Sequence, residues 1–285
     1  MCSFVEKLFK ISGSSTKDYI RPTRGSFGMK PEHIFKDKKQ TIKNKLLKVM
    51  KYMGSKNRIA KEILPIMLKE RGQRIWVEPF VGGANMIDKV PGEKIGADNQ
   101  KYIISLFKAL QNNWQPPKEV TEEYFHLVKN NKDKYQKELV GYLGTQLTFG
   151  CEWWGSFRRD NTGKRNYGTE AYNNVMRQQP NIKDIEFICS DYRDLEIPNG
   201  SLIYCDPPYR GVRKYVGNDK FDSDIFWEVC RNWSKQGHIV FVSEYTAPSD
   251  FECIWSKEIS ASANNSIKKG QGLKAVEKLF KFSPR

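Results

Sequence analysis

The sequence predicts an α/β fold in which a sheet is wound with helices on both faces. Short apolar segments that end in Gly, Asp or Pro alternate with helical stretches, which is the pattern of such a sheet. The last two apolar segments alternate like an antiparallel pair of strands. A polar and aromatic block, residues 112–183, interrupts the alternation and predicts a small inserted lobe.

The expected elements follow from the spacing of the apolar residues. A first helix is predicted over 57–69, where Ile59, Ile63 and Ile66 recur at helical spacing. Further helices are predicted at 101–110 and 222–235. Strands are predicted at 74–80, 94–99, 185–191, 201–209, 238–245, 251–259 and 274–282.

The charge of the chain is unevenly distributed. The 285 residues carry a formal net charge of +15, and residues 1–75 hold 19 Lys and Arg against 6 Asp and Glu. The rest of the chain is therefore nearly neutral. A solvated basic extension over residues 1–47 and an arm that attracts a polyanion such as nucleic acid are both consistent with this excess. Charge alone does not decide between them.

Composition excludes several classes of protein. A hydrophobic content of 39% is enough for a packed core and excludes general disorder. No stretch approaches the ~18 apolar residues of a membrane span, and the N-terminus has no apolar signal core. The 6 Cys form no CxxC pair and His number only 3, so no metal site is expected. These features predict a cytoplasmic protein that binds neither metal nor membrane. We also expect a monomer or weak dimer.

The most informative motif is Tyr-Cys-Asp-Pro-Pro-Tyr, at residues 204–209. The two prolines stiffen the backbone and have no N–H, so their carbonyls are free to accept hydrogen bonds. The Asp206 carboxylate beside the Pro207 carbonyl forms a pair of acceptors for an NH2 group. The ring of Tyr209 is suited to stacking on a planar base. The alternative interpretation is a proline-rich strand exit with an Asp that caps a helix.

Three other predicted strand ends carry residues suited to a nucleotide-like ligand. A strand runs into Gly82 and Gly83, where the backbone can approach a ligand closely. Asp98 ends the second strand, where an acid typically binds ribose hydroxyls. Asp191 lies at the end of the third strand and could accept from an adenine amino group. Each acid alone is more often a turn or cap residue, but their order along the chain indicates one site.

With these motifs in this order, residues 48–285 resemble the Dam-type (alpha-group) DNA adenine-N6 methyltransferases. Lys-Tyr-Met-Gly-Ser-Lys (51–56) is similar to the family's K-W-x-G-[GS]-K segment, and Phe80 begins a stretch similar to its FxGxG cofactor loop. Ala84 stands where the second glycine of that loop is expected. The resemblance implies a Rossmann-like methyltransferase fold with a seven-stranded mixed sheet and a C-terminal antiparallel hairpin. It also implies a catalytic domain over 48–111 and 184–285 and a mainly helical target-recognition lobe over 112–183.

The resemblance further implies methyl transfer from S-adenosyl-L-methionine to N6 of an adenine flipped out of double-stranded DNA. The catalytic motif would be Asp206, Pro207, Pro208 and Tyr209. The implied cofactor-binding residues are Tyr52, Lys56, Phe80, Gly82, Gly83, Asp98, Asp191, Tyr192 and Asp206. The candidate DNA contacts are Arg158, Arg159, Asn161, Lys164 and Arg165 in the lobe, with Arg210, Arg213 and Lys214 on phosphates.

Three questions stay open at this point. N4-cytosine methylation uses the same acceptors, although those enzymes more often carry Ser in place of Asp206. A catalytically silent DNA-binding relative is suggested only by Ala84. Trp153 and Trp154 are either core residues of the lobe or aromatics that contact DNA where a base has left the stack.

Overall fold

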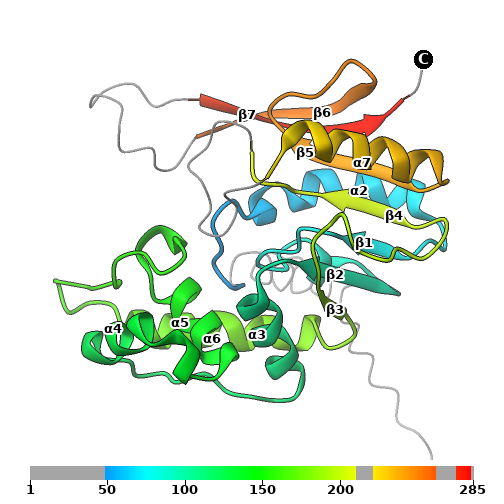
Figure 1. Cartoon of the computed structure of the whole chain (residues 1–285). Helices are drawn as coiled ribbons and strands as arrows, with labels where there is room; N and C mark the ends of the chain where they lie inside the picture. The colour runs from blue at the N-terminus through cyan, green and yellow to red at the C-terminus, as the bar shows by residue number, and fades with distance from the viewer. Residues whose placement is uncertain (1–48, 210–220, 261–273, 284–285) are drawn as a thin grey trace, which may run out of the picture. The chain divides into compact units, whose positions relative to one another are not determined.

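The computed structural model describes residues 49–209, 221–260 and 274–283. They include a seven-stranded sheet in the order β3-β2-β1-β4-β5-β7-β6, with helices on both faces (Figure 1). The pairs among β1 to β5 are parallel, and β7 pairs antiparallel with both β5 and β6. The predicted α/β sheet with a C-terminal antiparallel hairpin is confirmed.

The predicted strands and helices occur at the expected places, and most strands end short of the predicted spans because their last residues enter loops. The strands are β1 (Trp76–Glu78), β2 (Lys94–Asp98), β3 (Glu186–Cys189), β4 (Leu202–Cys205), β5 (Ile239–Glu244), β6 (Phe251–Ser260) and β7 (Lys274–Phe282). The α-helices are α2 (Ala60–Arg71), α3 (Lys101–Gln111), α4 (Glu122–Asn130), α5 (Lys137–Gln146), α6 (Tyr167–Gln178) and α7 (Ser223–Lys235). Short 3-10 helices are η1 (Lys56–Arg58), η2 (Ile87–Lys89), η3 (Lys132–Lys134), η4 (Phe149–Cys151) and η5 (Gln179–Asn181).

Both faces of the sheet are buried, as expected for parallel strands between helices. Successive side chains of a strand point to opposite faces, so Trp76 and Val77 belong to two separate apolar clusters. The first cluster contains residues of α2 and α3, and the second contains residues of α7. Figure 1 shows α2 and α7 on the two faces of the sheet.

Side-chain caps define where two of the helices begin. The carboxylate of Asp222 accepts the N–H groups of Asp224 and Ile225, at 2.8 and 3.1 Å, and so starts α7. The side-chain oxygen of Asn166 accepts the Thr169 N–H at 2.9 Å and starts α6. Such caps satisfy N–H groups that have no partner within the helix.

The helices α4 to α6 share their core with one face of the sheet. Gly141 allows α5 to approach α3 closely, because a Cβ at this position would lie 2.3 Å from the Tyr102 carbonyl oxygen. Trp154 is 6% exposed and belongs to the same apolar cluster as Trp76. Trp153 stacks on Tyr102 with ring centres 5.6 Å apart. These contacts favour the core interpretation of the tryptophan pair.

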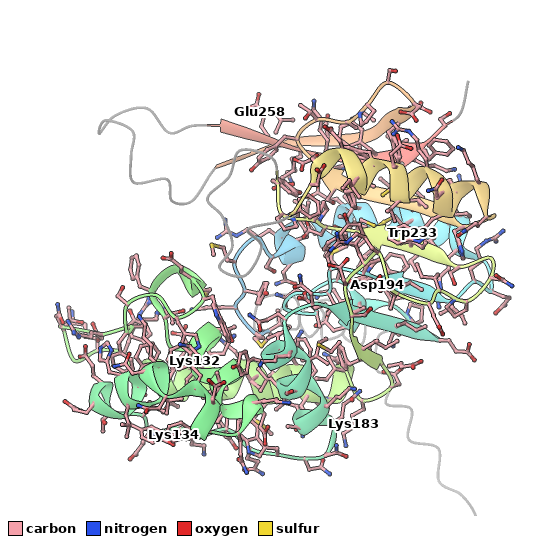
Figure 2. All side chains as sticks on the ribbon, in the orientation of Figure 1. Lys132, Lys134, Lys183, Asp194, Trp233 and Glu258 are labelled. Carbon is pink, nitrogen blue, oxygen red and sulfur yellow. The ribbon has the colours of Figure 1, made fainter. Side chains whose placement is uncertain are left out.

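Figure 2 shows the side chains of this helical segment, with Lys132 and Lys134 labelled. The Lys132 ammonium lies 5.3 Å from the ring centre of Trp154. In the part of the chain that the structure describes, no helix is both long and apolar enough to cross a membrane.

Candidate active site

Residues at the carboxyl ends of four neighbouring strands lie along one edge of the sheet. Phe80 follows β1, Asp98 ends β2, Asp191 lies beyond β3 and Asp206 follows β4. Strand β1 lies between β2 and β4, so the winding of the sheet reverses there. In open α/β sheets, ligands bind outside the carboxyl ends of the strands at such a switch point.

Asp206 is held by a lysine from a distant part of the chain. The Asp206 side chain is 22% exposed, and Nζ of Lys56 lies 2.9 Å from its Oδ1 atom. Burial raises the pKa of Asp206, and the ammonium of Lys56 counteracts this rise. Lys56 also donates to the carbonyl oxygen of Gly54 at 3.0 Å. The ion pair therefore joins the segment before α2 to the end of β4.

Tyr209 lies against the same ammonium. Nζ of Lys56 is 4.5 Å from the centre of the Tyr209 ring, and the ring of Tyr245 meets it edge-on at 4.7 Å. The Tyr209 hydroxyl donates a hydrogen bond to Oε2 of Glu277 at 2.8 Å. Burial, with Asp206 and Glu277 close by, raises the pKa of Tyr209 well above its usual value. The hydroxyl therefore keeps its proton at neutral pH.

The glycine loop after β1 is tied to Asp98. The N–H of Gly82 donates to Oδ2 of Asp98 at 3.0 Å, and the N–H of Gln100 donates to Oδ1 at 2.9 Å. Burial raises the pKa of Asp98, and these two donors lower it. The ring of Tyr52 covers the loop, so a Cβ at Gly83 would lie 2.5 Å from the Cβ of Tyr52. The loop thus has no room for a side chain at Gly83.

Ala84 adopts the conformation that the expected glycine would favour. Its φ is +53°, in the left-handed region, and the residue is fully buried. This conformation costs an L-residue about 1 kcal/mol. The side-chain amide of Gln178 donates to the carbonyl oxygens of Gly83 and Ala84 at 3.0 and 3.2 Å. These contacts support the loop in its left-handed turn.

Asp191 has a partner in the structure. Nε and Nη2 of Arg193 donate to its two carboxylate oxygens at 2.8 and 2.9 Å, and this hydrogen bonding lowers the pKa of Asp191. Tyr192 packs on Phe80 with ring centres 5.1 Å apart. Burial raises the pKa of Tyr192 to about 12. Tyr192, the residue after Asp191, therefore packs with Phe80 in the second apolar cluster.

Two of the candidate DNA contacts have partners within the helical segment. Arg158 is 18% exposed, and its guanidinium lies 3.9 Å from the ring centre of Tyr167. Arg159 forms an ion pair with Glu122. An open hollow of about 600 Å³ is lined in part by Arg158, Arg159, Lys164 and Arg165. Asn161, Lys164 and Arg165 are exposed, and Arg210, Arg213 and Lys214 lie outside the described residues.

A comparison with protein families decides what this site belongs to. The model of the D12 class N6 adenine-specific DNA methyltransferases matches residues 52–276. The chain belongs to this family. It is an adenine-specific DNA methyltransferase, as the resemblance of its motifs implied, and N4-cytosine methylation is not favoured.

The methyltransferase also resembles a solved structure described as a putative methyltransferase, yhhF, from Escherichia coli. The two chains are 9% identical, the match covers 83% of this chain and 92% of that one, and the TM-score is 0.35.

Two residues that contact the candidate site were missed from the sequence. Glu277 reaches Tyr209 from β7, and Gln178 reaches the glycine loop from the end of α6. The alternation of β7 held a signal for the first, because Glu277 shares its strand face with the buried Leu279. An acid on an apolar face indicates a buried partner. The sequence held no comparable signal for Gln178.

Proposed function

We propose that the enzyme takes the methyl group from S-adenosyl-L-methionine and delivers it to N6 of an adenine that has left the stack of double-stranded DNA. The observation that carries this proposal is the Asp206 carboxylate, held by Lys56 next to Tyr209 at the switch point of the sheet. Asp98 and the glycine loop lie along the same edge. Asp206 would accept a hydrogen bond from the amine, and Asp98 with the glycine loop would bind a nucleoside.

The residues beside Asp206 fit a cofactor that contains adenosine. Each oxygen of Asp98 accepts one backbone N–H, and a carboxylate offers about four lone-pair positions, so Asp98 retains capacity for ribose hydroxyls. Asp191 accepts three donors from Arg193 and keeps about one lone-pair position, on Oδ2. The rings of Phe80 and Tyr192 suit a planar base. S-adenosylmethionine supplies an electrophilic methyl group on a positively charged sulfur. We assign Tyr52, Gly82 and Gly83 to the same binding site.

The side chains at Asp206 complement that positive charge. Two carboxyl groups, of Asp206 and Glu277, surround the single ammonium of Lys56. Their ionised forms leave an excess of negative charge in a mostly buried site, where electrostatic interactions are stronger than in water. A positively charged group is therefore favoured beside them.

Asp206 and the Pro207 carbonyl would act directly on the target adenine. The N6 lone pair is delocalised into the ring, which makes N6 a poor nucleophile. Hydrogen bonds from the amino group to Asp206 and Pro207 stabilise the positive charge that develops as the N–C bond forms and the C–S bond breaks. N6 then loses a proton, which Asp206 is placed to accept. Tyr209 would stack on the flipped base, with Pro208 keeping the motif extended.

We assign recognition of the DNA sequence to residues 112–183 and catalysis to 48–111 and 184–285. The exposed side chains of Asn161, Lys164 and Arg165 have the chemistry to contact bases or phosphates. The basic residues of 1–47, which lie outside the described residues, are proposed to add non-specific attraction to DNA.

Transfer of labelled methyl groups tests the proposal. The full chain is incubated with methyl-labelled S-adenosylmethionine and unmethylated double-stranded DNA, and the DNA is digested to nucleosides. We expect the label in N6-methyladenine. Asp206→Ala should lower the rate by at least about 100-fold while cofactor binding is partly retained. Glu252→Ala, at an exposed position on β6, is the control. Label in another nucleoside, or full turnover by Asp206→Ala, would refute the proposal.

A further inference from the structure

One buried acid at the active site has no role in the proposed mechanism beyond its charge. Glu277 lies on β7 and is only 6% exposed. Burying a carboxylate is unfavourable unless it is paired or hydrogen-bonded. Its partners are therefore expected to have a structural or functional importance of their own.

Glu277 contacts two members of the proposed site. Its Oε2 atom accepts the hydrogen bond of the Tyr209 hydroxyl at 2.8 Å, and the same oxygen lies 4.0 Å from Nζ of Lys56. Lys56 in turn lies 2.9 Å from Oδ1 of Asp206. The ammonium is therefore placed between two carboxyl groups that come from different strands, with Asp206 as the nearer one.

We propose that Glu277 is a positioning residue for methyl transfer, which anchors the Tyr209 hydroxyl and shares the Lys56 ammonium with Asp206. The inference rests on the proposed function of Asp206 as acceptor for the target amine. Because Glu277 attracts the Lys56 ammonium as well, the ammonium is not bound to Asp206 alone. An oxygen of Asp206 then remains a strong acceptor when the amino group of adenine arrives.

The chemistry of the ammonium supports this sharing. An ammonium has three protons. The Lys56 ammonium donates one to the Gly54 carbonyl oxygen and lies within ion-pair distance of both carboxyl groups. Charge-assisted hydrogen bonds are about twice as strong as neutral ones, so a lysine bound to Asp206 alone would compete with the weaker donor N6–H. Glu277 offers the ammonium a second partner within a short movement.

The anchored hydroxyl has a separate effect on Tyr209. Its ring is held at the hydroxyl by Glu277 and packs nearly perpendicular to the ring of Tyr245, with ring centres 4.7 Å apart. A stacking ring with a fixed plane requires less ordering when a base enters. Misplacement of a contact group by about 1 Å can cost about 100-fold in rate.

The electrostatic effect of Glu277 on Asp206 has a defined sign. Glu277 raises the pKa of Asp206, because a like charge disfavours a second carboxylate. Loss of the Glu277 charge should therefore shift the acid limb of the pH–rate profile to lower pH. The titratable groups that face Asp206 from the surrounding elements are Lys56, Glu78, Tyr204, Cys205, Tyr209, Tyr245 and Glu277.

Steady-state methylation by the full chain tests the inference with Glu277→Gln and, as the matched control, Glu252→Gln on the neighbouring strand. We expect Glu277→Gln to lower kcat by about tenfold or more, because Lys56 then competes for Asp206 alone, with a smaller change in the KM for S-adenosylmethionine. Its acid limb should lie at lower pH than that of the wild type. Glu252→Gln should match the wild type in both respects. A purely structural role of Glu277 would lower the rate without moving the limb.

Two further variants separate the roles of charge and contact. Glu277→Asp keeps the charge but is too short for the 2.8 Å contact, so kcat should fall while the limb stays near its wild-type pH. Tyr209→Phe removes only the hydroxyl. Its effect should not add to that of Glu277→Asp, because both variants break the same hydrogen bond, whereas a glutamine at position 277 can still accept it through its amide oxygen. If Glu277→Gln does not fold, Glu277→Asp and Tyr209→Phe still decide the anchoring role.

The outcomes distinguish this inference from the proposed function. A wild-type chain that does not methylate DNA adenine with S-adenosylmethionine overturns the proposed function. An active wild type with an equally active Glu277→Gln variant, or with additive effects and an unmoved limb, overturns only the role of Glu277.

Discussion

Nζ of Lys56 lies 2.9 Å from Oδ1 of Asp206, although the two residues are far apart in the sequence. The positively charged ammonium thus lies next to a carboxyl group that is mostly buried. Without it, burial and the nearby Glu277 would raise the pKa of Asp206 further and favour the protonated form. Lys56 therefore favours the ionised form of the proposed acceptor.

Replacing Lys56 by Met should shift the pH dependence of the enzyme. Removal of the ammonium raises the pKa of Asp206 further, so the acid limb of kcat/KM should move to higher pH. The pH–rate profile of labelled methyl transfer measures this shift. Lys61→Met, at an exposed position on α2, serves as the control and should leave the profile unchanged. An unmoved limb in Lys56→Met would show that the pair does not set the protonation of Asp206.

The same variant should lose stability as the pH rises. A carboxyl group whose pKa is raised in the folded state favours folding below its unfolded pKa, and this contribution disappears as the pH rises through the folded pKa. Because Lys56→Met raises the folded pKa of Asp206, its melting temperature should fall more steeply than that of the wild type between acid and neutral pH. Thermal unfolding across that range measures the difference.

Gly83, rather than the residue at position 84, is expected to be the sensitive position of the cofactor loop. Gly83→Ala would place a Cβ 2.5 Å from the Cβ of Tyr52, so Tyr52 or the loop must move. We expect a weakened affinity for S-adenosylmethionine, measured by isothermal titration calorimetry. Ala84→Gly is the matched comparison. This variant removes the cost of the left-handed conformation, about 1 kcal/mol. It also loses the burial of a methyl group, which stabilises by a similar amount, so the free energy of unfolding should change little. Equal effects of the two variants would contradict this account.

The outline of the site could be predicted because its signals are local. An apolar strand followed at once by an acid identifies Asp98 and Asp206 without knowledge of the fold. The pairing of Lys56 with Asp206 and of Tyr209 with Glu277 depends on which strands become neighbours. Strand β7 reaches the site because it pairs between β5 and β6, and alternation along one strand does not specify that order.

The contact of Gln178 with the glycine loop also depends on the packing of distant segments and could not be predicted from the sequence. Its amide donates to the carbonyls of Gly83 and Ala84, and its oxygen accepts the Met50 N–H at 3.3 Å. Gln178→Leu leaves these buried groups unsatisfied, so we expect a loss of about 2 kcal/mol in stability and a raised KM for S-adenosylmethionine. Gln179→Leu removes a single bond to the Leu110 carbonyl and should leave the KM unchanged. A normal KM for S-adenosylmethionine in Gln178→Leu would show that the contact of Gln178 with the loop does not support cofactor binding.

The arginines of the helical segment should divide into a structural and a recognition group. Arg158 packs on Tyr167, so Arg158→Ala should lower the melting temperature with little change in sequence preference. Arg165 is exposed beside Lys164, so Arg165→Ala should leave the melting temperature unchanged. A lost contact to a base edge should alter the preference among DNA substrates by roughly tenfold or more. Methylation of a panel of duplexes, read by modification-aware sequencing, measures the preference. If both variants change it equally, Arg158 also reaches the DNA and its packing on Tyr167 must open when DNA binds.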